Sequence, residues 1–166
     1  MSPRPASENN FRPVPVPSGK AYRVASPPQD ALVMPALAVE LERVLERFAT
    51  EAGFGERQPV PVVFRPGVVG HHRENRAADI YAVGGVGLEE WKRRWDEAER
   101  RGDLAEERRR NLGWRLYKAL QAYGRWSQPY GYPIQLFGPW TRNEGPWKYI
   151  SDRLLHAHRD HIHAAK

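Results

Sequence analysis

The amino-acid sequence predicts an α+β domain, with a small and mostly antiparallel sheet flanked by about three helices. Two observations support this class. Three stretches repeat apolar residues at helical spacing, and short β-branched stretches lie between Gly and Pro residues. The 166 residues suit one domain, and a hydrophobic content of 40%, with six Trp, is enough to bury a core.

The first part of the chain is expected to be a tail. Residues 1–28 are rich in Pro, Ser and Asn, a composition that favours extended, poorly packed backbone, so we predict a Pro-rich flexible tail or linker before a folded domain at 29–166. This stretch has no apolar run typical of a signal peptide, so delivery to another compartment would need another route. The sequence leaves open the location, and whether the tail docks on a secretion or phage machinery.

Three helices are predicted in order along the chain. Residues 36–52 carry apolar side chains on one face and Glu and Arg on the other. A second helix is expected over residues 88–100, with an apolar stripe that includes two Trp. A third begins at Asp103, whose spacing to Glu106 matches a capping box, and continues to Tyr123.

Short strands are expected at residues 59–65, 79–83, 134–137 and 161–164. The prolines of the first strand suit an edge position or the entry of the strand. The segment 126–147 is rich in aromatic residues, Gly and Pro. Such a segment either walls a substrate cleft or covers the core, and the sequence does not choose between the two.

The charge balance indicates which partners the surface attracts. The chain has 26 Lys and Arg against 20 Asp and Glu, a net charge of +6, which favours polyanions such as nucleic acid or an acidic cell wall. Acidic residues are interleaved with Arg over residues 100–110, which favours a solvated helical face with weak ion pairs over a nucleic-acid surface. No apolar run is long enough to span a membrane, so no membrane partner is expected.

The six histidines lie in two windows of the sequence. His71 and His72 are adjacent, and the other four fall within residues 156–163. Because the chain has no cysteine, any metal ion must take His, carboxylate or water ligands. Structural histidines would not collect in this way, so we interpret the two windows as halves of one site.

The spacing within the windows predicts a zinc site. His72 and Asp79 lie on either side of a turn that enters a strand, and His161 and His163 are two residues apart, so their side chains share one side of a sheet. Neutral imidazole and carboxylate suit zinc, and a catalytic zinc needs three protein ligands with one position left for water. Two histidines and one aspartate meet that count.

The stretch from His72 to Asp79, His-Arg-Glu-Asn-Arg-Ala-Ala-Asp, resembles the first zinc motif of the LAS metallopeptidases, Ser-x-His-x-x-Gly-x-Ala-x-Asp. This group unites lysostaphin-type enzymes, D-alanyl-D-alanine carboxypeptidases and penicillin-insensitive murein endopeptidases. The ending His-Arg-Asp-His-Ile-His, residues 158–163, is similar to the endopeptidase ending His-x-x-His-x-His. Two positions depart from the first motif. Gly70 stands where the motif has Ser, and Asn75 stands where it has Gly. Asn tolerates the left-handed backbone that such a glycine provides.

The resemblance implies three zinc ligands, which are His72, Asp79 and His163. It assigns His161 to the histidine that contacts the metal's water and transfers a proton, and His158 to a further active-site histidine. Asp160 lies where the carboxypeptidase branch places its glutamate base. Arg65 is similar to the arginine aimed at the substrate carbonyl or carboxylate. Whether His161, Asp160 or His158 is the base stays open.

The function implied is that of a LAS-like metallopeptidase, a hydrolase of the bacterial cell wall. Zinc would activate a water to cleave stem or cross-bridge peptides of peptidoglycan, as a carboxypeptidase or an endopeptidase. One alternative is a zinc-dependent nuclease or nucleic-acid-binding toxin domain, although the sequence has no phosphate-cradling motif and nucleic acid is the less favoured partner. The other is a degenerate, non-catalytic binding module with the peptidase fold.

Overall fold

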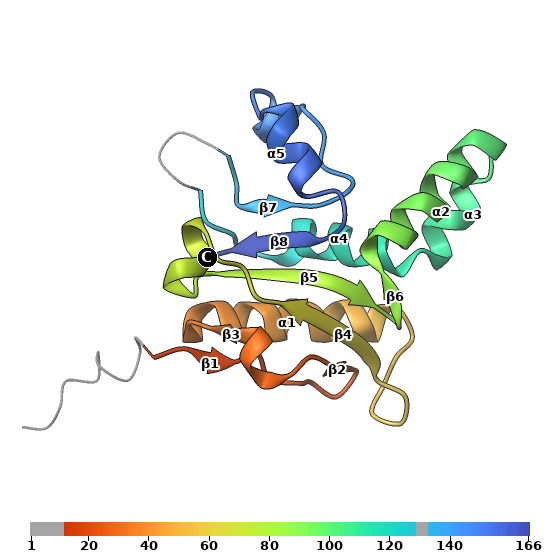
Figure 1. Cartoon of the computed structure of the whole chain (residues 1–166). Helices are drawn as coiled ribbons and strands as arrows, with labels where there is room; N and C mark the ends of the chain where they lie inside the picture. The colour runs from red at the N-terminus through yellow and green to blue at the C-terminus, as the bar shows by residue number, and fades with distance from the viewer. Residues whose placement is uncertain (1–11, 129–132) are drawn as a thin grey trace, which may run out of the picture.

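The computed structural model describes residues 12–128 and 133–166 and has the predicted α+β class (Figure 1). Six strands form the main sheet of the described residues: β2 (Tyr22–Val24), β4 (Val60–Arg65), β5 (Ala77–Val83), β6 (Val86–Gly87), β7 (Leu136–Phe137) and β8 (Ile162–Ala165). Their order is β2-β4-β5-β8-β7, with β6 beside β5. The β2–β4 pair is parallel, and the other pairs of this sheet are antiparallel, as predicted for most of the sheet.

Residues 12–28 belong to the folded domain, so the predicted end of a flexible tail at residue 28 is wrong. Here β1 (Val14–Pro15) pairs with β3 (Leu32–Val33), and β2 extends the main sheet. Three side chains of this stretch are buried: Val16, Ala21 and Tyr22. The Pro-rich composition does favour extended backbone, but this backbone pairs at the edge of a sheet and buries its apolar side chains. Residues 1–11 lie outside the described part of the chain.

The four predicted strands form β4, β5, β7 and β8, with differences at their ends, whereas β1, β2, β3 and β6 were not predicted. β5 begins at Ala77, two residues earlier than expected, and only Leu136–Phe137 of the predicted 134–137 strand pairs as β7. β4 lies between β2 and β5, so the edge position considered for its prolines is wrong. Pro61, the second residue of β4, instead sits at the entry of the strand.

The described residues contain five α-helices: α1 (Pro35–Glu51), α2 (Leu88–Arg101), α3 (Leu104–Arg110), α4 (Leu112–Tyr123) and α5 (Asp152–Ala157). The first two confirm the predicted helices, whereas the third predicted helix is divided into α3 and α4 at Asn111. The buried Asn111 side chain donates to the carbonyl of Trp91 and accepts from the backbone N–H of Trp114, so it caps α4 and ends α3. The predicted capping box at Asp103 does not form.

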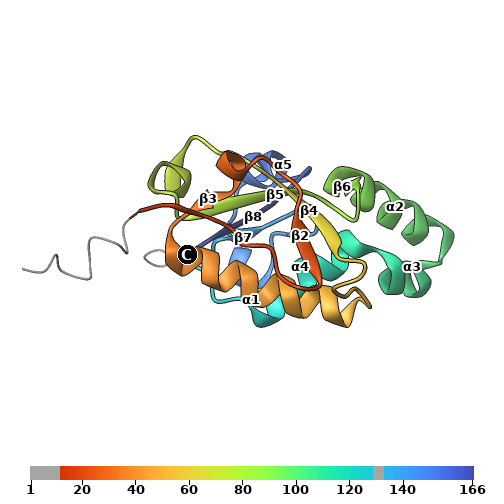
Figure 2. The same cartoon turned by 90° about the horizontal axis from the view of Figure 1, so that it is seen from below.

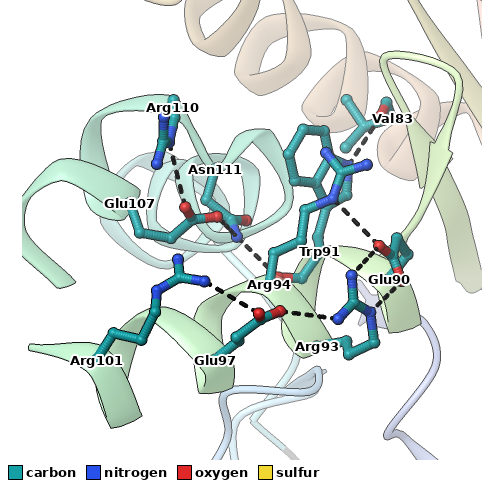
Figure 3. Close-up of polar contacts among 10 residues, drawn as sticks. All are labelled: Val83, Glu90, Trp91, Arg93, Arg94, Glu97, Arg101, Glu107, Arg110 and Asn111. Carbon is teal, nitrogen blue, oxygen red and sulfur yellow. Dashed lines mark hydrogen bonds and ion pairs between the residues drawn. The ribbon is translucent and has the colours of Figure 1, made fainter. Parts of the chain in front are cut away.

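Arg and Glu side chains pair along α2 and α3 (Figure 3). Arg93 binds both Glu90 and Glu97, at 2.7 and 2.9 Å, and Arg101 binds Glu97 at 3.0 Å. These groups are exposed, where an ion pair contributes about 1 kcal/mol or less. Within the predicted stretch 100–110, Arg109 pairs with Glu106, and Arg110 pairs with the buried Glu107 at 3.3 Å. The predicted pairing of Arg and Glu is present there, whereas the preference against a nucleic-acid surface stays a prediction.

The core lies on one face of the sheet, beneath α1 and α4 (Figure 2). Ile80 of β5 and Ile162 of β8 pair across the sheet and are fully buried in this core. Because side chains alternate along a strand, Asp79 and His163 point to the opposite face. The helices α2 and α3 lie side by side and extend away from the sheet (Figures 1 and 2). None of the helices in residues 12–128 and 133–166 has the length and apolar character needed to span a membrane.

A buried carboxylate on α1 holds later parts of the chain against the core. Glu40, only 7% exposed, accepts a hydrogen bond from the backbone N–H of Arg125 at 2.6 Å and from Arg43 at 2.7 Å. The ammonium group of Lys166 lies 3.7 Å away. Burial raises the pKa of the Glu40 carboxyl, but the two hydrogen bonds and the charge of Lys166 outweigh burial, so the pKa lies below its usual value.

We expect Glu40→Gln to lower the free energy of unfolding by about 1–3 kcal/mol at pH 7, because an amide makes weaker hydrogen bonds to these donors. Since the pKa of Glu40 is lower in the folded state, its stabilisation is present above the unfolded pKa and is lost as pH falls through the folded pKa. The difference between variant and wild type, measured by urea unfolding, should shrink from pH 7 towards pH 3. Glu42→Gln, at an exposed position on the same helix, is the control, and an equal loss there would contradict the assignment.

Candidate metal centre

One row of residues crosses the sheet on the face opposite to α1 and α4. By strand register, Arg65 of β4 lies beside Asp79 of β5, Asp79 beside His163 of β8, and His163 beside Phe137 of β7. The β5–β8 pairing joins residues that are 84 positions apart in the chain. It brings the two histidine windows of the sequence together at one place on the sheet.

The Asp79 carboxylate lies between three histidines. Its Oδ2 is 3.2 Å from Nε2 of His72, and its Oδ1 is 3.1 Å from Nδ1 of His163 and 3.7 Å from Nε2 of His161. One ligand atom from each of His72, Asp79 and His163 lies within 4.8 Å of the other two. These three side chains, which are the ligands predicted from the sequence, could together hold a metal ion.

Asp79 carries its charge in a buried position, with 7% of the residue exposed. Burial raises the pKa of its carboxyl, but hydrogen bonds from His163 and His72 and the charge of His161 outweigh burial, so the pKa lies well below its usual range. A buried carboxylate must be compensated by donors or by a cation. A metal ion held by the two imidazoles would supply this compensation.

A tight turn presents His72 to the site. The 3₁₀ turn Gly70–Glu74 ends at Asn75, whose φ of 56° is left-handed and whose N–H donates to the carbonyl of His72 at 3.0 Å. Asn75 thus has the left-handed backbone that Asn was expected to tolerate at this position. The His72 ring lies against Gly67, where a Cβ atom would come within 2.4 Å of the ring. Gly67 therefore makes room for the ring.

Gln135 orients His163 and was not singled out in the sequence. Its Oε1 accepts from Nε2 of His163 at 3.1 Å, so both ring nitrogens of His163 face oxygen atoms. This arrangement suits two N–H donors, or one N–H and a metal ion at Nδ1, and metal-binding histidines commonly donate their other N–H in this way. The backbone of Gln135 is fixed by hydrogen bonds to Ser127 and Ala165.

His161 forms a pair with Asp160 beside the ligand set. Its Nδ1 lies 2.7 Å from Oδ1 of Asp160, which accepts the N–H, and its Nε2 faces Asp79. The ring of Tyr81 stacks on His161 with centroids 4.8 Å apart. The guanidinium of Arg65 lies 4.7 Å from the centroid of the Tyr81 ring, so Arg65 is linked to the site through Tyr81.

His158 packs against both histidines of the last strand region, with ring centroids 5.0 Å from His161 and 5.3 Å from His163. Its Nδ1–H donates to the carbonyl of Leu154 at 2.8 Å. Burial lowers the pKa of His158 to about 4, with the charges of His163 and His161 adding to the effect, so the ring is neutral at pH 7. The two remaining histidines, His71 and His156, are not among the three grouped ligands.

No protein-family model matches this chain, and neither a curated protein nor a solved structure matches it. Fold and site together define an α+β domain with a His-Asp-His group that could hold a metal ion. The likeness to the LAS metallopeptidases stays a prediction from the two sequence motifs.

Changing any one of the three grouped ligands should empty the site. After zinc loading and dialysis, we expect one zinc per chain in wild type and a value near zero in His72→Ala, Asp79→Ala and His163→Ala, measured by elemental mass spectrometry. His161→Ala should keep the metal because His161 is outside the group. The exposed His156→Ala serves as the control. A zinc-free His161→Ala, or a zinc-loaded His72→Ala, would show that the ligands are different.

Removing the Gln135 side-chain acceptor should weaken the metal site without unfolding the domain. We expect Gln135→Leu to lower zinc affinity by about 10- to 100-fold, because the His163 ring loses the acceptor that fixes its orientation. Competition with a chromophoric chelator measures this change. Gln128→Leu, at an exposed position, is the matched control, and equal affinities in the two variants would argue against this role for Gln135.

Proposed function

We propose that this chain is a zinc-dependent peptidase that hydrolyses stem or cross-bridge peptides of bacterial peptidoglycan. The observation that carries the proposal is the convergence of His72, Asp79 and His163 next to a second carboxylate–histidine pair, Asp160 and His161. The first group has the composition of a metal site, and the second has that of a proton-transfer pair. The substrate class comes from the resemblance of both sequence motifs to the LAS metallopeptidases.

The donor set and its spacing fit zinc. Two imidazole nitrogens and one carboxylate oxygen make three protein ligands, the number found in catalytic zinc sites that keep a fourth position for water. Tetrahedral zinc with bonds of about 2.0–2.1 Å separates its ligand atoms by roughly 3.3 Å. Oδ1 of Asp79 lies 3.1 Å from His163 and Oδ2 lies 3.2 Å from His72, and one ligand atom from each of the three residues lies within 4.8 Å of the others. Zinc bound there would polarise the scissile carbonyl and lower the pKa of a water molecule.

His161 is the proton carrier in this proposal. When Nδ1–H of His161 is donated to Asp160, Nε2 lies on the side of Asp79 on which the ligands converge, 3.7 Å from Oδ1 of Asp79. A neutral imidazole in this position takes a proton from the attacking water and returns it to the leaving amine. Asp160 then stabilises the imidazolium and keeps the ring in one tautomer, which makes Asp160 a positioning residue rather than the base. His158 is neutral and supports the two rings by packing.

Arg65 is proposed to stabilise negative charge on the substrate. It ends β4 in the same row as Asp79 and is exposed, so its guanidinium is open to a bound peptide. Its contact with the Tyr81 ring, which in turn stacks on His161, limits the positions of the guanidinium. A fixed positive charge at this place suits a developing oxyanion or a terminal carboxylate.

Zinc-loaded protein should release soluble muropeptides from purified peptidoglycan, detected by liquid chromatography and mass spectrometry. We expect no release from His163→Ala, which lacks a metal ligand. His161→Ala should keep its zinc and lose about 100- to 10,000-fold in rate, the usual contribution of a general acid–base residue.

The same preparations are assayed on DNA and RNA. Cleavage of nucleic acid without release of muropeptides would replace the peptidase by the nuclease alternative. Bound zinc without turnover of any of these substrates would leave a non-catalytic binding module. Equal muropeptide release by wild type and His163→Ala would locate the activity outside this site.

A further inference from the structure

A second cavity lies outside the metal centre, among α2, α3, α4 and the segment that follows β7. Its volume is about 540 Å³, within the range of roughly 300–1,000 Å³ that small-molecule sites occupy. Five aromatic side chains line it: Trp95, Trp114, Tyr117, Trp140 and Trp147. Trp140 also packs against the main core. The aromatic segment was expected either to wall a cleft or to cover the core. Trp140 does both, because it lines the cavity and packs against the main core.

Two indole N–H groups at this cavity have no acceptor. The Nε1 atoms of Trp140 and Trp147 are buried, and neither has a hydrogen-bond partner in the part of the chain that the structure describes. By contrast, Trp91 donates to the carbonyl of Val83 at 3.0 Å and Trp126 to that of Leu120 at 2.8 Å. A buried donor without an acceptor destabilises the folded state. Both donors belong to side chains that line the cavity, so a ligand whose binding uncovers the indole edges would supply the missing acceptors.

The charged side chains around the cavity are nearly balanced in sign. They are Arg108, Lys118, Arg142, Glu99 and Glu144. A wall with three cations and two anions does not favour a polyanion, and it offers both donors and acceptors. Whereas the neighbouring charges of α2 pair with one another (Figure 3), Glu99, Arg142 and Glu144 form no ion pair within residues 12–128 and 133–166. Hydroxyl groups, which donate and accept, match such a wall.

The aromatic rings provide flat surfaces for the same ligand. Trp95 and Trp114 are stacked with centroids 5.0 Å apart, and Trp140 meets Trp95 edge-on at 6.2 Å. Arg108 lies over both stacked rings, at 5.7 and 5.9 Å. Large rings held in place by packing offer apolar contact area to a ligand that is apolar on its faces and polar at its edge.

The cavity and the metal centre share the segment that begins with β7. Trp147, at the cavity, packs in one buried cluster with Phe137. The Phe137 ring lies 5.8 Å from that of His163 and 5.1 Å from that of His158. The cavity is therefore connected to the metal centre by a series of packed rings, Trp147, Phe137 and His163.

We propose that this cavity binds an N-acetylated sugar unit of the peptidoglycan glycan strand. The face of a pyranose ring packs on the Trp side chains, and hydroxyl and acetamido oxygens accept from the indole N–H groups of Trp140 and Trp147. That the sugar belongs to the cell wall rests on the proposed function, whereas sugar binding by the cavity does not. The cavity would hold the glycan while the metal centre acts on the attached peptide.

The test uses the full chain, labelled with ¹⁵N and titrated with an N-acetylglucosamine tetrasaccharide. The indole N–H signals of Trp140 and Trp147, assigned with Trp140→Phe and Trp147→Phe, should shift, and those of Trp91 and Trp126 should not. Each of the two variants should weaken sugar binding by about three- to tenfold, the effect of one lost hydrogen bond. Trp126→Phe is the matched control, because its indole N–H already has an acceptor within the protein.

A second variant keeps the test informative if a Trp substitution unfolds the domain. Arg142→Ala changes an exposed wall residue and should also weaken sugar binding by about threefold or more, the effect of one lost hydrogen bond.

His163→Ala should bind the sugar as wild type does while losing peptidase activity, so the two proposals fail separately. Sugar-induced shifts without wall cleavage would support the cavity and overturn the peptidase. Cleavage without these shifts, shifts spread over all Trp signals, or a response to an oligonucleotide instead of the sugar would overturn the cavity proposal.

Discussion

The buried carboxylate of Asp79 is the constraint on which the arrangement of the site depends. Its charge lies on β5, an interior strand, so compensation must come from groups that the fold brings to it. His72 arrives from the turn that precedes β5, and His163 from the last strand, 84 residues later. An uncompensated buried charge costs several kcal/mol, so docking of β8 and compensation of Asp79 are energetically coupled. The same contacts that stabilise the sheet assemble the metal-binding group.

Alternate residues of the last strand, β8, belong to the core and to the metal centre. Ile162 and Ala164 are buried in the core beneath α1 and α4, whereas His163 faces Asp79 on the other side of the sheet. A shift of one residue in the β5–β8 register would exchange the two sets, placing imidazoles in the core and apolar side chains at the site. The core and the carboxylate therefore specify the same register. This agreement explains how a strand of four residues can complete a site whose parts are far apart in sequence.

The sequence groups the histidines with Asp79 because few residue types bind metals and because strand periodicity places His161 and His163 on one side of the sheet. The choice of His163 over His161 as ligand comes from the resemblance to the LAS metallopeptidases, and it agrees with the grouping in the structure. The sequence does not reveal side-chain contacts that form only when two strands pair. Gln135 becomes a partner of His163 only through the β7–β8 pairing, and Gly67 matters only because the His72 ring packs on it. The helix break at Asn111 has the same origin, since a buried side-chain hydrogen bond to Trp91 overrides a continuous helical pattern. The buried Tyr22 likewise belongs to a stretch whose composition resembles a linker.

The metal centre and the aromatic cavity require different kinds of supporting structure. The metal centre needs a few side chains held to within tenths of an ångström, and paired strands of a sheet provide that precision. The aromatic cavity needs area and mixed polarity, and it is built from helices and a connecting segment at the side of the sheet. Phe137 contacts the His163 ring and packs with Trp147, so side-chain packing joins the structural supports of the two sites.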